Sequence, residues 1–332
     1  LLLLIVTALY SHRIVTFQLG DTRMIILVLQ EAFTFISMII IWYCSVRFQF
    51  HHVKLLIQME DVLMELQRLG IWIYYPKKQK QMYCKIVLRL IIIGISITGQ
   101  AASTHTRWRL IVYLGGIVSS IMFLLVGIYI SAVKEYYGIL NKYLSQLSNF
   151  KNEQIADTLK LEITSFLKTK LEILKIIVPL HHKLYIIMNT INHVFGVIFI
   201  ALFGVTFILV IVDAYYLITL LDETQMQVIA VLCNCLPGLV DAIIICYLCN
   251  SMMDEIDLSG LLIHQLSIAE SKDVKEQIDV LSLQLTQEKT EINAAGLFPV
   301  NYGLIFSIIC GVITNLVILV QFSKSVQWNS KI

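Results

Sequence analysis

Seven long runs of apolar residues divide this sequence. A helix that crosses a lipid bilayer needs about 20 mainly apolar residues. Hydrophobic residues make up 58% of the 332 residues and charged residues 14%, whereas a soluble domain carries about 25% charged residues. The runs lie at residues 1–17, 24–48, 86–100, 110–130, 184–221, 228–251 and 300–322. The sequence therefore predicts an all-α, polytopic membrane protein with seven transmembrane helices.

The charges between the runs predict how these helices are oriented. Lys and Arg residues next to transmembrane helices are retained in the cytoplasm. Eighteen of these cations follow the second, fourth and sixth runs, and six fall on the opposite side of the membrane. We therefore expect the N-terminus inside the cell and the C-terminus outside. A G-protein-coupled receptor has the reverse orientation, which argues against that class.

Two segments between the runs, residues 131–183 and 252–292, are expected to extend the helices into the cytoplasm. Their apolar residues recur at steps of three and four, which is the spacing of one helix face. We expect transmembrane helices one to four with one cytoplasmic loop (1–130), a cytoplasmic helical segment (131–183), transmembrane helices five and six (184–251), a cytoplasmic helical anchor (252–299), the last helix (300–323) and an extracellular tail (324–332).

Motifs of the common enzyme classes do not occur in this sequence. It contains no HExxH, GxxxxGK[ST] or GxSxG stretch. Two pairs, His51-His52 and His181-His182, lack the further His clusters that a metal centre needs, and they are more typical of interfacial side chains. We expect no catalysis, no cofactor, no metal and no nucleic-acid partner.

Polar residues gather in the halves of the apolar runs that we expect to face outward. Ionisable groups inside a membrane are costly and indicate function by default. Carboxylates and amides can bind the hydroxyls of a sugar while an aromatic ring packs on its C–H face; the alternative is that these side chains only hold helices together. The candidate ligand-binding residues are Gln30, Glu31, Trp108, Arg109, Asp213, Tyr216, Gln227, Asn234 and Asp241.

The last apolar run carries a stripe of small and polar residues on one helix face. Such a stripe indicates either a close-packed helix interface or the wet wall of a pore. If several copies meet at an axis, the residues at the outer end would form rings there. The candidate pore and gate residues are Ser307, Gly311, Thr314, Ile318, Gln321 and Phe322.

The segment before the last run is strongly acidic. Residues 252–292 contain nine Asp or Glu against three Lys. Beneath a pore, this field would concentrate cations at its mouth; a solvated helix face is the alternative. No Asp or Glu lies on the stripe itself, so we expect weak discrimination among cations.

The C-terminal run also carries a specific motif. It reads Thr314-Asn315, five apolar residues, then Gln321-Phe322. This pattern resembles the signature of the insect gustatory receptor family within the insect chemoreceptor superfamily, with Asn315 where the family usually has Tyr.

Two further stretches resemble the same family. AAGLFPVN, residues 294–301, is similar to a family motif that ends in Asp, where this chain has Asn301. The family's His-x-x-Leu and Asn-x-x-Phe-Gly patterns are matched within HHKLYIIMNTINHVFGVIF by His182, Leu184 or Tyr185, Asn192, Phe195 and Gly196.

The resemblance implies a homotetrameric, ligand-gated, nonselective cation channel that crosses the plasma membrane several times. The last helix of each subunit would line the pore, with Gln321 and Phe322 as gate candidates, and a small-molecule tastant would bind in the outer half of the bundle. The buried carboxylates favour a sugar, such as the monosaccharide fructose. A bitter-compound-gated channel of the same family, a metabotropic receptor and a transporter are the alternatives.

Overall fold

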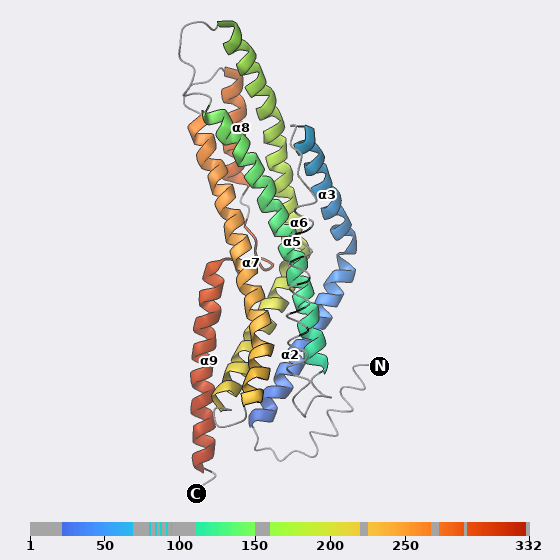
Figure 1. The fold of residues 1–332 in the computed structure, drawn as a ribbon, viewed down its shortest axis with the longest axis vertical. Helices are drawn as coiled ribbons and strands as arrows, with labels where there is room; N and C mark the ends of the chain where they lie inside the picture. Colours follow the sequence, from blue (N-terminus) through green and yellow to red (C-terminus); the bar gives the residue numbers. More distant parts are fainter. Residues whose placement is uncertain are drawn as a thin grey trace.

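Figure 1 shows a computed structural model of the chain. The structure describes residues 22–68, 110–149, 160–219, 225–266, 272–288 and 291–329, together with residues 80, 84, 87, 91 and 94. The described residues form helices and one isolated β-bridge, between Asn293 and Pro299. The predicted all-α class is confirmed. The helices are α2 (Thr22–Arg47), α3 (Gln49–Arg68), α5 (Leu110–Asn149), α6 (Lys160–Thr219), α7 (Gln225–Leu266), α8 (Lys272–Gln287) and α9 (Tyr302–Asn329).

Among the described residues, five segments are long and apolar enough to cross a membrane. They match five of the predicted runs and lie at Leu29–Arg47, Gly115–Leu147, Leu171–Tyr215, Leu236–Leu266 and Tyr302–Gln321. The run predicted at 1–17 lies outside the described residues, as does most of the run at 86–100. The polytopic membrane architecture follows from these five segments.

The longest helix, α6, is longer than any bilayer requires. Its 60 residues rise about 1.5 Å each, which gives a rod about 90 Å long. The helix continues without a break through the boundary that we predicted between residues 183 and 184. Pro179 lies inside it, and the missing N–H of a proline removes one backbone hydrogen bond there.

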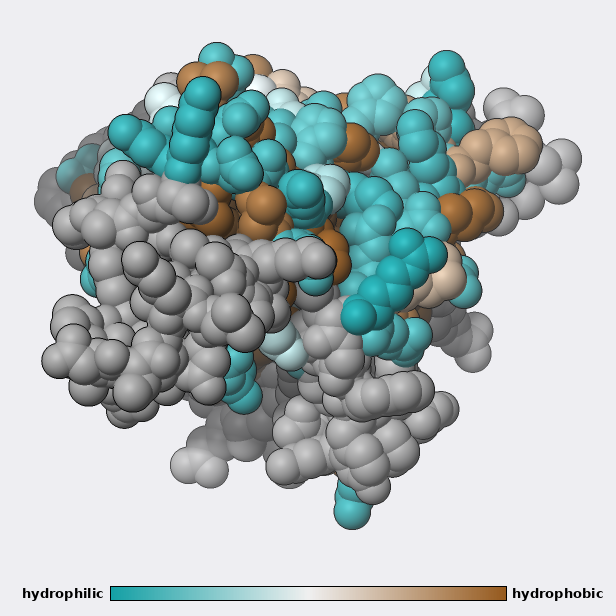
Figure 2. Space-filling view, turned by 90° about the horizontal axis from the view of Figure 1, so that it is seen from above, coloured by the Kyte–Doolittle hydropathy of each residue, from teal (hydrophilic) through white to brown (hydrophobic). Residues whose placement is uncertain are grey.

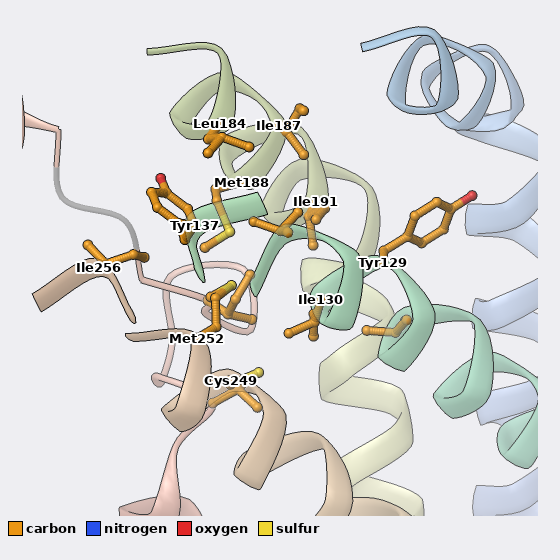
Figure 3. Close-up of a cluster of buried hydrophobic side chains, with 14 of the residues drawn as sticks. Tyr129, Ile130, Tyr137, Leu184, Ile187, Met188, Ile191, Cys249, Met252 and Ile256 are labelled. Carbon is orange, nitrogen blue, oxygen red and sulfur yellow. The ribbon is translucent and has the colours of Figure 1, made fainter. Parts of the chain in front are cut away.

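The bundle is organised around α5, α6 and α7, which run along most of the molecule (Figure 1). Helix α2 packs against α5 and α6 in the lower half, while α3 and α8 pack against α6 towards the upper end. Side chains of α5, α6 and α7 meet in the core, where Tyr137, Met188 and Met252 are fully buried (Figure 3). Helix α9 lies at the edge and packs against α6 and α7.

The surfaces of the two halves differ in polarity. Seen from above, the described residues of the upper end present mainly hydrophilic side chains, with smaller hydrophobic areas between them (Figure 2). Lower in the molecule, α2 and α9 leave large apolar side chains uncovered, such as Trp42 at 71% exposure and Phe306 at 68%. The upper end is thus suited to water, and the outer faces of α2 and α9 are suited to lipid or to other protein chains.

Candidate functional site

Polar and small residues of four helices meet in the lower half of the bundle. We call this set the polar ring: Gln30, Thr34 and Ser37 of α2, Gly115 and Ser120 of α5, Thr206 and Asp213 of α6, and Gly238 and Asp241 of α7. The polar members are all buried, with 2–5% of their surface exposed. Contacts between successive helices close the ring, and the following paragraphs describe them in turn.

The contact between α5 and α7 is a hydrogen bond between two buried side chains. The Ser120 hydroxyl donates to Oδ2 of Asp241 at 3.2 Å. A carboxylate in a lipid-facing bundle is costly unless it is hydrogen-bonded. The Ser120 hydroxyl thus provides one hydrogen-bond partner for Asp241 within the bundle.

Helix α2 approaches α5 and α6 closely at two places. At Gly115, an added Cβ would overlap Cγ2 of Thr34 and lie 3.4 Å from Sδ of Met38. One turn further along α2, the Ser37 hydroxyl lies 3.5 Å from the carbonyl oxygen of Ala201 in α6. The Thr34 hydroxyl itself donates to the Gln30 carbonyl at 2.8 Å.

The contact between α6 and α7 completes the ring. An added Cβ at Gly238 would lie 3.7 Å from Oγ1 of Thr206. Asp213 lies seven residues beyond Thr206, which is two helical turns, and it is 5% exposed. The structure thus buries the predicted residues Gln30, Asp213 and Asp241 between helices, and it adds Ser120 and Thr206 to the buried polar residues.

The remaining predicted ligand residues are only partly described. Glu31, next to Gln30 on α2, is half-buried. Trp108 and Arg109 lie outside the described residues, and the side chains of Tyr216, Gln227 and Asn234 do so as well, although their backbone is helical. Whether the cluster forms a pocket stays a prediction.

The predicted stripe of α9 divides between two surroundings. Ser307, Thr314, Ile318 and Gln321 are exposed, whereas Gly311 faces α6, where an added Cβ would lie 2.9 Å from Cε2 of Phe207. At Gly311, therefore, the first of the two alternatives applies, a close helix contact. The side chain of Phe322 lies outside the described residues.

The polar side chains of α9 bond to their own helix. The hydroxyls of Ser307 and Thr314 donate to the carbonyls of Gly303 and Cys310, each at 2.9 Å, and the Asn315 amide donates to the carbonyl of Gly311 at 2.8 Å. None of the 20 residues of the span Tyr302–Gln321 is buried inside the described part of the chain.

One polar contact missed by the sequence reasoning lies where α8 leads into α9. Asn192 of α6 bonds to the backbone at both Glu291 and Asn293. Asn192 belongs to one of the family-like motifs and Glu291 and Asn293 directly precede another, but nothing in their local sequence indicates that they touch. A pattern of paired substitutions among relatives is the signal that could reveal it.

The pair His181-His182 also occupies a more specific position than the sequence indicated. His181 is 1% exposed, packs its ring on that of Tyr137 at 5.6 Å between centroids, and lies 3.8 Å from Oε2 of Glu288. His182 bonds to the other oxygen of Glu288. His181 is thus a buried residue rather than an interfacial one. Among the described residues, no group of three His, Cys, Asp or Glu is arranged to hold a metal.

The chain is similar to known chemoreceptors in sequence and in fold. A family model described as "7tm Chemosensory receptor" matches residues 1–326. Over 168 residues, 48% of this chain, the sequence is 28% identical to the Putative gustatory receptor 28b of Drosophila melanogaster, and this alignment spans 36% of that receptor.

One solved structure of an insect receptor shares this fold. The insect olfactory receptor OR5 from Machilis hrabei superposes with a TM-score of 0.62 at 17% identity, over 92% of this chain and 83% of the receptor. The structure of the same receptor in complex with eugenol gives a TM-score of 0.44 at 15% identity, over 86% of this chain and 69% of the receptor. The family is one of membrane receptors, so the prediction that the chain is not an enzyme is confirmed. Because the family model matches nearly the whole chain, the chain belongs to the 7tm chemosensory receptor family, as its C-terminal motifs predicted.

Proposed function

We propose that this chain is the subunit of a tastant-gated, nonselective cation channel of the plasma membrane, that four copies surround a central pore lined by α9, and that the ligand is a sugar. The observation that carries the proposal is the exposure of α9. A span of 20 residues without a buried member gains little from packing within its own chain, so its exposed faces are available to lipid and to other copies.

The exposed side of α9 has two chemically different faces. Large apolar side chains lie at Phe306, Ile309 and Ile313, with exposures of 68%, 47% and 57%. Ser307, Thr314 and Gln321 share the other face because residues three, four and seven apart lie on one side of a helix. An apolar face beside a small and polar face is what a helix needs if it contacts a neighbour on one side and water on the other.

Exposed acidic groups support cations as the permeating ions. Asp254 and Asp257 of α7 and Asp273, Glu276 and Asp279 of α8 are all exposed. These helices precede α9 in the chain. A cluster of negative charge near a pore entrance raises the local concentration of cations there.

The polar ring supports a hydroxyl-rich ligand. Asp241 accepts a hydrogen bond from a hydroxyl, and Asp213 is a second carboxylate buried between the helices. A carboxylate oxygen accepts strong hydrogen bonds from hydroxyl groups. An apolar alkaloid would offer these groups fewer partners.

The direct test is a recording of cation current from cells that express this chain alone. We define the tastant panel as fructose, glucose, sucrose, quinine and caffeine, each applied singly with G proteins blocked. We expect an inward cation current within milliseconds of sugar application. A current evoked by an alkaloid but by none of the sugars would assign the bitter-gated alternative, and loss of all current upon G-protein block would assign the metabotropic one.

Two substitutions separate the gate from the ligand site. Gln321→Ala should change the unitary conductance or the open time, whereas Ile309→Ala on the apolar face should leave the conductance unchanged. Asp241→Asn should raise the half-activating sugar concentration by about tenfold, the effect of weakening one hydrogen bond to a charged group, and Asp61→Asn in α3 is its matched control. Wild-type currents in Gln321→Ala would contradict the pore assignment.

A further inference from the structure

We propose that the segment between α8 and α9 is a fixed joint through which α6 positions α9, and that Asn192 and Gly196 are positioning residues for gating. We call residues 291–301 the α8–α9 joint. The inference rests on the proposed channel function, because it concerns how movement in the bundle would reach the pore helix.

A single amide side chain of α6 holds the joint at two points. Nδ2 of Asn192 donates to the carbonyl oxygen of Glu291 at 2.7 Å, and the N–H of Asn293 donates to Oδ1 of Asn192 at 3.0 Å. An amide that offers both a donor and an acceptor fixes the position and the direction of the backbone it binds. No aliphatic side chain could do this.

One helical turn further along α6, the joint touches the helix itself. A Cβ added to Gly196 would lie 2.8 Å from the backbone N of Ala295 and 3.1 Å from its Cα. The atoms in the way belong to the backbone, so no side-chain rotation relieves the overlap. Glycine is therefore required for this approach of joint to helix.

The joint is also rigid within itself. Ala294, Leu297 and Val300 donate backbone hydrogen bonds to Phe298, Ala294 and Ile292 at 2.9, 3.0 and 2.9 Å. The N–H of Gly296 donates to Oδ1 of Asn293 at 2.7 Å. Ala294 is fully buried, and Ile292 and Val300 are 1% and 3% exposed. These contacts leave the segment little freedom to bend.

Backbone strain at the tip of the joint shows that its contacts determine its shape. Ala295 has a φ of +50°, a left-handed conformation that costs an ordinary residue about 1–2 kcal/mol. Such a conformation persists where the surrounding contacts over-determine it. The next residue, Gly296, has a φ of +78°, which glycine adopts without that cost.

Helix α9 begins directly at the end of the joint. The N–H of Leu304 donates to Oδ1 of Asn301 at 3.3 Å, so Asn301 caps the first turn. The position of the joint therefore fixes the start of α9, because no flexible linker lies between them. A displacement of α6 moves the start of α9 by the same amount.

The same helix also carries part of the proposed ligand site. Thr206 and Asp213 of the polar ring lie on α6, ten and seventeen residues beyond Gly196. Phe207, the residue after Thr206, contacts α9 at Gly311. A ligand that shifts α6 in the polar ring would thus move α9 both at its N-terminal end and at Gly311.

Two glycines of α6 provide a matched pair for the test. Gly196→Ala forces the joint away from the helix, whereas among the described residues a Cβ at Gly204 would meet no atom within 4 Å. Two readouts are measured for each variant of the full chain: hydrogen–deuterium exchange of residues 291–300 in detergent, and current evoked by the tastant panel relative to surface expression. We expect about tenfold faster exchange and a severalfold smaller maximal current for Gly196→Ala, and neither change for Gly204→Ala.

Asn192→Asp gives an independent second variant that preserves shape and volume. It retains the acceptor for Asn293 but places an oxygen against the carbonyl of Glu291, so exchange and current should change in the same direction as for Gly196→Ala. Unchanged exchange in both variants would show that the joint is not held as described. Faster exchange with wild-type current would overturn the gating role while leaving the channel function intact. A wild-type chain that gives no current with any member of the panel would overturn the channel function itself, and the gating role with it.

Discussion

Replacing Gly115 with Ala tests the closest helix contact in the polar ring. Gly→Ala within a helix normally stabilises it by about 1 kcal/mol. At Gly115 the new methyl group overlaps Cγ2 of Thr34, and overpacking of this kind costs about 1–3 kcal/mol. At Gly116 the added Cβ would meet no atom of the described residues within 4 Å. The difference between the two variants isolates the overpacking cost.

Thermal unfolding of the purified chain in detergent measures this difference. One kcal/mol corresponds to roughly 2–4 °C in Tm for chains somewhat shorter than this one, so Gly115→Ala should melt several degrees below Gly116→Ala. Adding Thr34→Ser removes the obstructing methyl group and retains the hydroxyl that bonds to Gln30. The double variant should therefore recover most of the loss. Equal Tm values for the two alanine variants, or no recovery with Thr34→Ser, would refute the close approach of α2 and α5.

Three further predictions concern stability. Asn141→Ala should destabilise the chain by about 2–4 kcal/mol. The substitution removes an amide that donates to the Glu255 carbonyl at 2.7 Å and accepts from the Ser259 hydroxyl at 2.5 Å. Lys142→Ala, at the exposed neighbouring position, is the control in the same melting assay. Gly296→Ala should cost about 1 kcal/mol through backbone strain alone, since its φ is +78° and the described residues leave its Cβ unobstructed, and a Tm equal to that of the parent would contradict this. Burial, and secondarily the charge of His51, lowers the pKa of His52 from its ordinary 6.5. As the pH falls below about 6.5, the unfolded chain takes up a proton at His52 before the folded chain does, so stability is lost. The variant His52→Gln should therefore show a smaller fall in Tm than the parent between about pH 7 and pH 5.5.

The length and composition of the apolar runs were sufficient to predict the fold class, because burial in a bilayer depends on residue type more than on specific contacts. Five predicted runs correspond to apolar helices of the described structure. The continuity of α6 across residues 183 and 184 was not predicted, because both sides favour helix and Pro179, four residues earlier, lies inside the helix without ending it.

The individual contacts of the site depended on tertiary structure. Asp213 and Asp241 could be singled out because a carboxylate in an apolar run is rare. Ser120 could not, since one hydroxyl in an apolar helix commonly bonds to its own backbone. Gly311 was placed on the stripe by its spacing, but only the position of Phe207 reveals that it faces α6. Asn192 contacts backbone 99 residues away, a separation at which local patterns carry no information.

The internal hydrogen bonds of α9 have a consequence for the cost of placing a single chain in a membrane. An unsatisfied polar group in hydrocarbon costs several kcal/mol, and an orphan subunit would expose Ser307, Thr314 and Asn315 to lipid. Because each of these side chains already bonds to a carbonyl of its own helix, the solitary chain incurs little of that cost. In the channel proposed above, each chain could therefore enter the membrane before it meets the other copies.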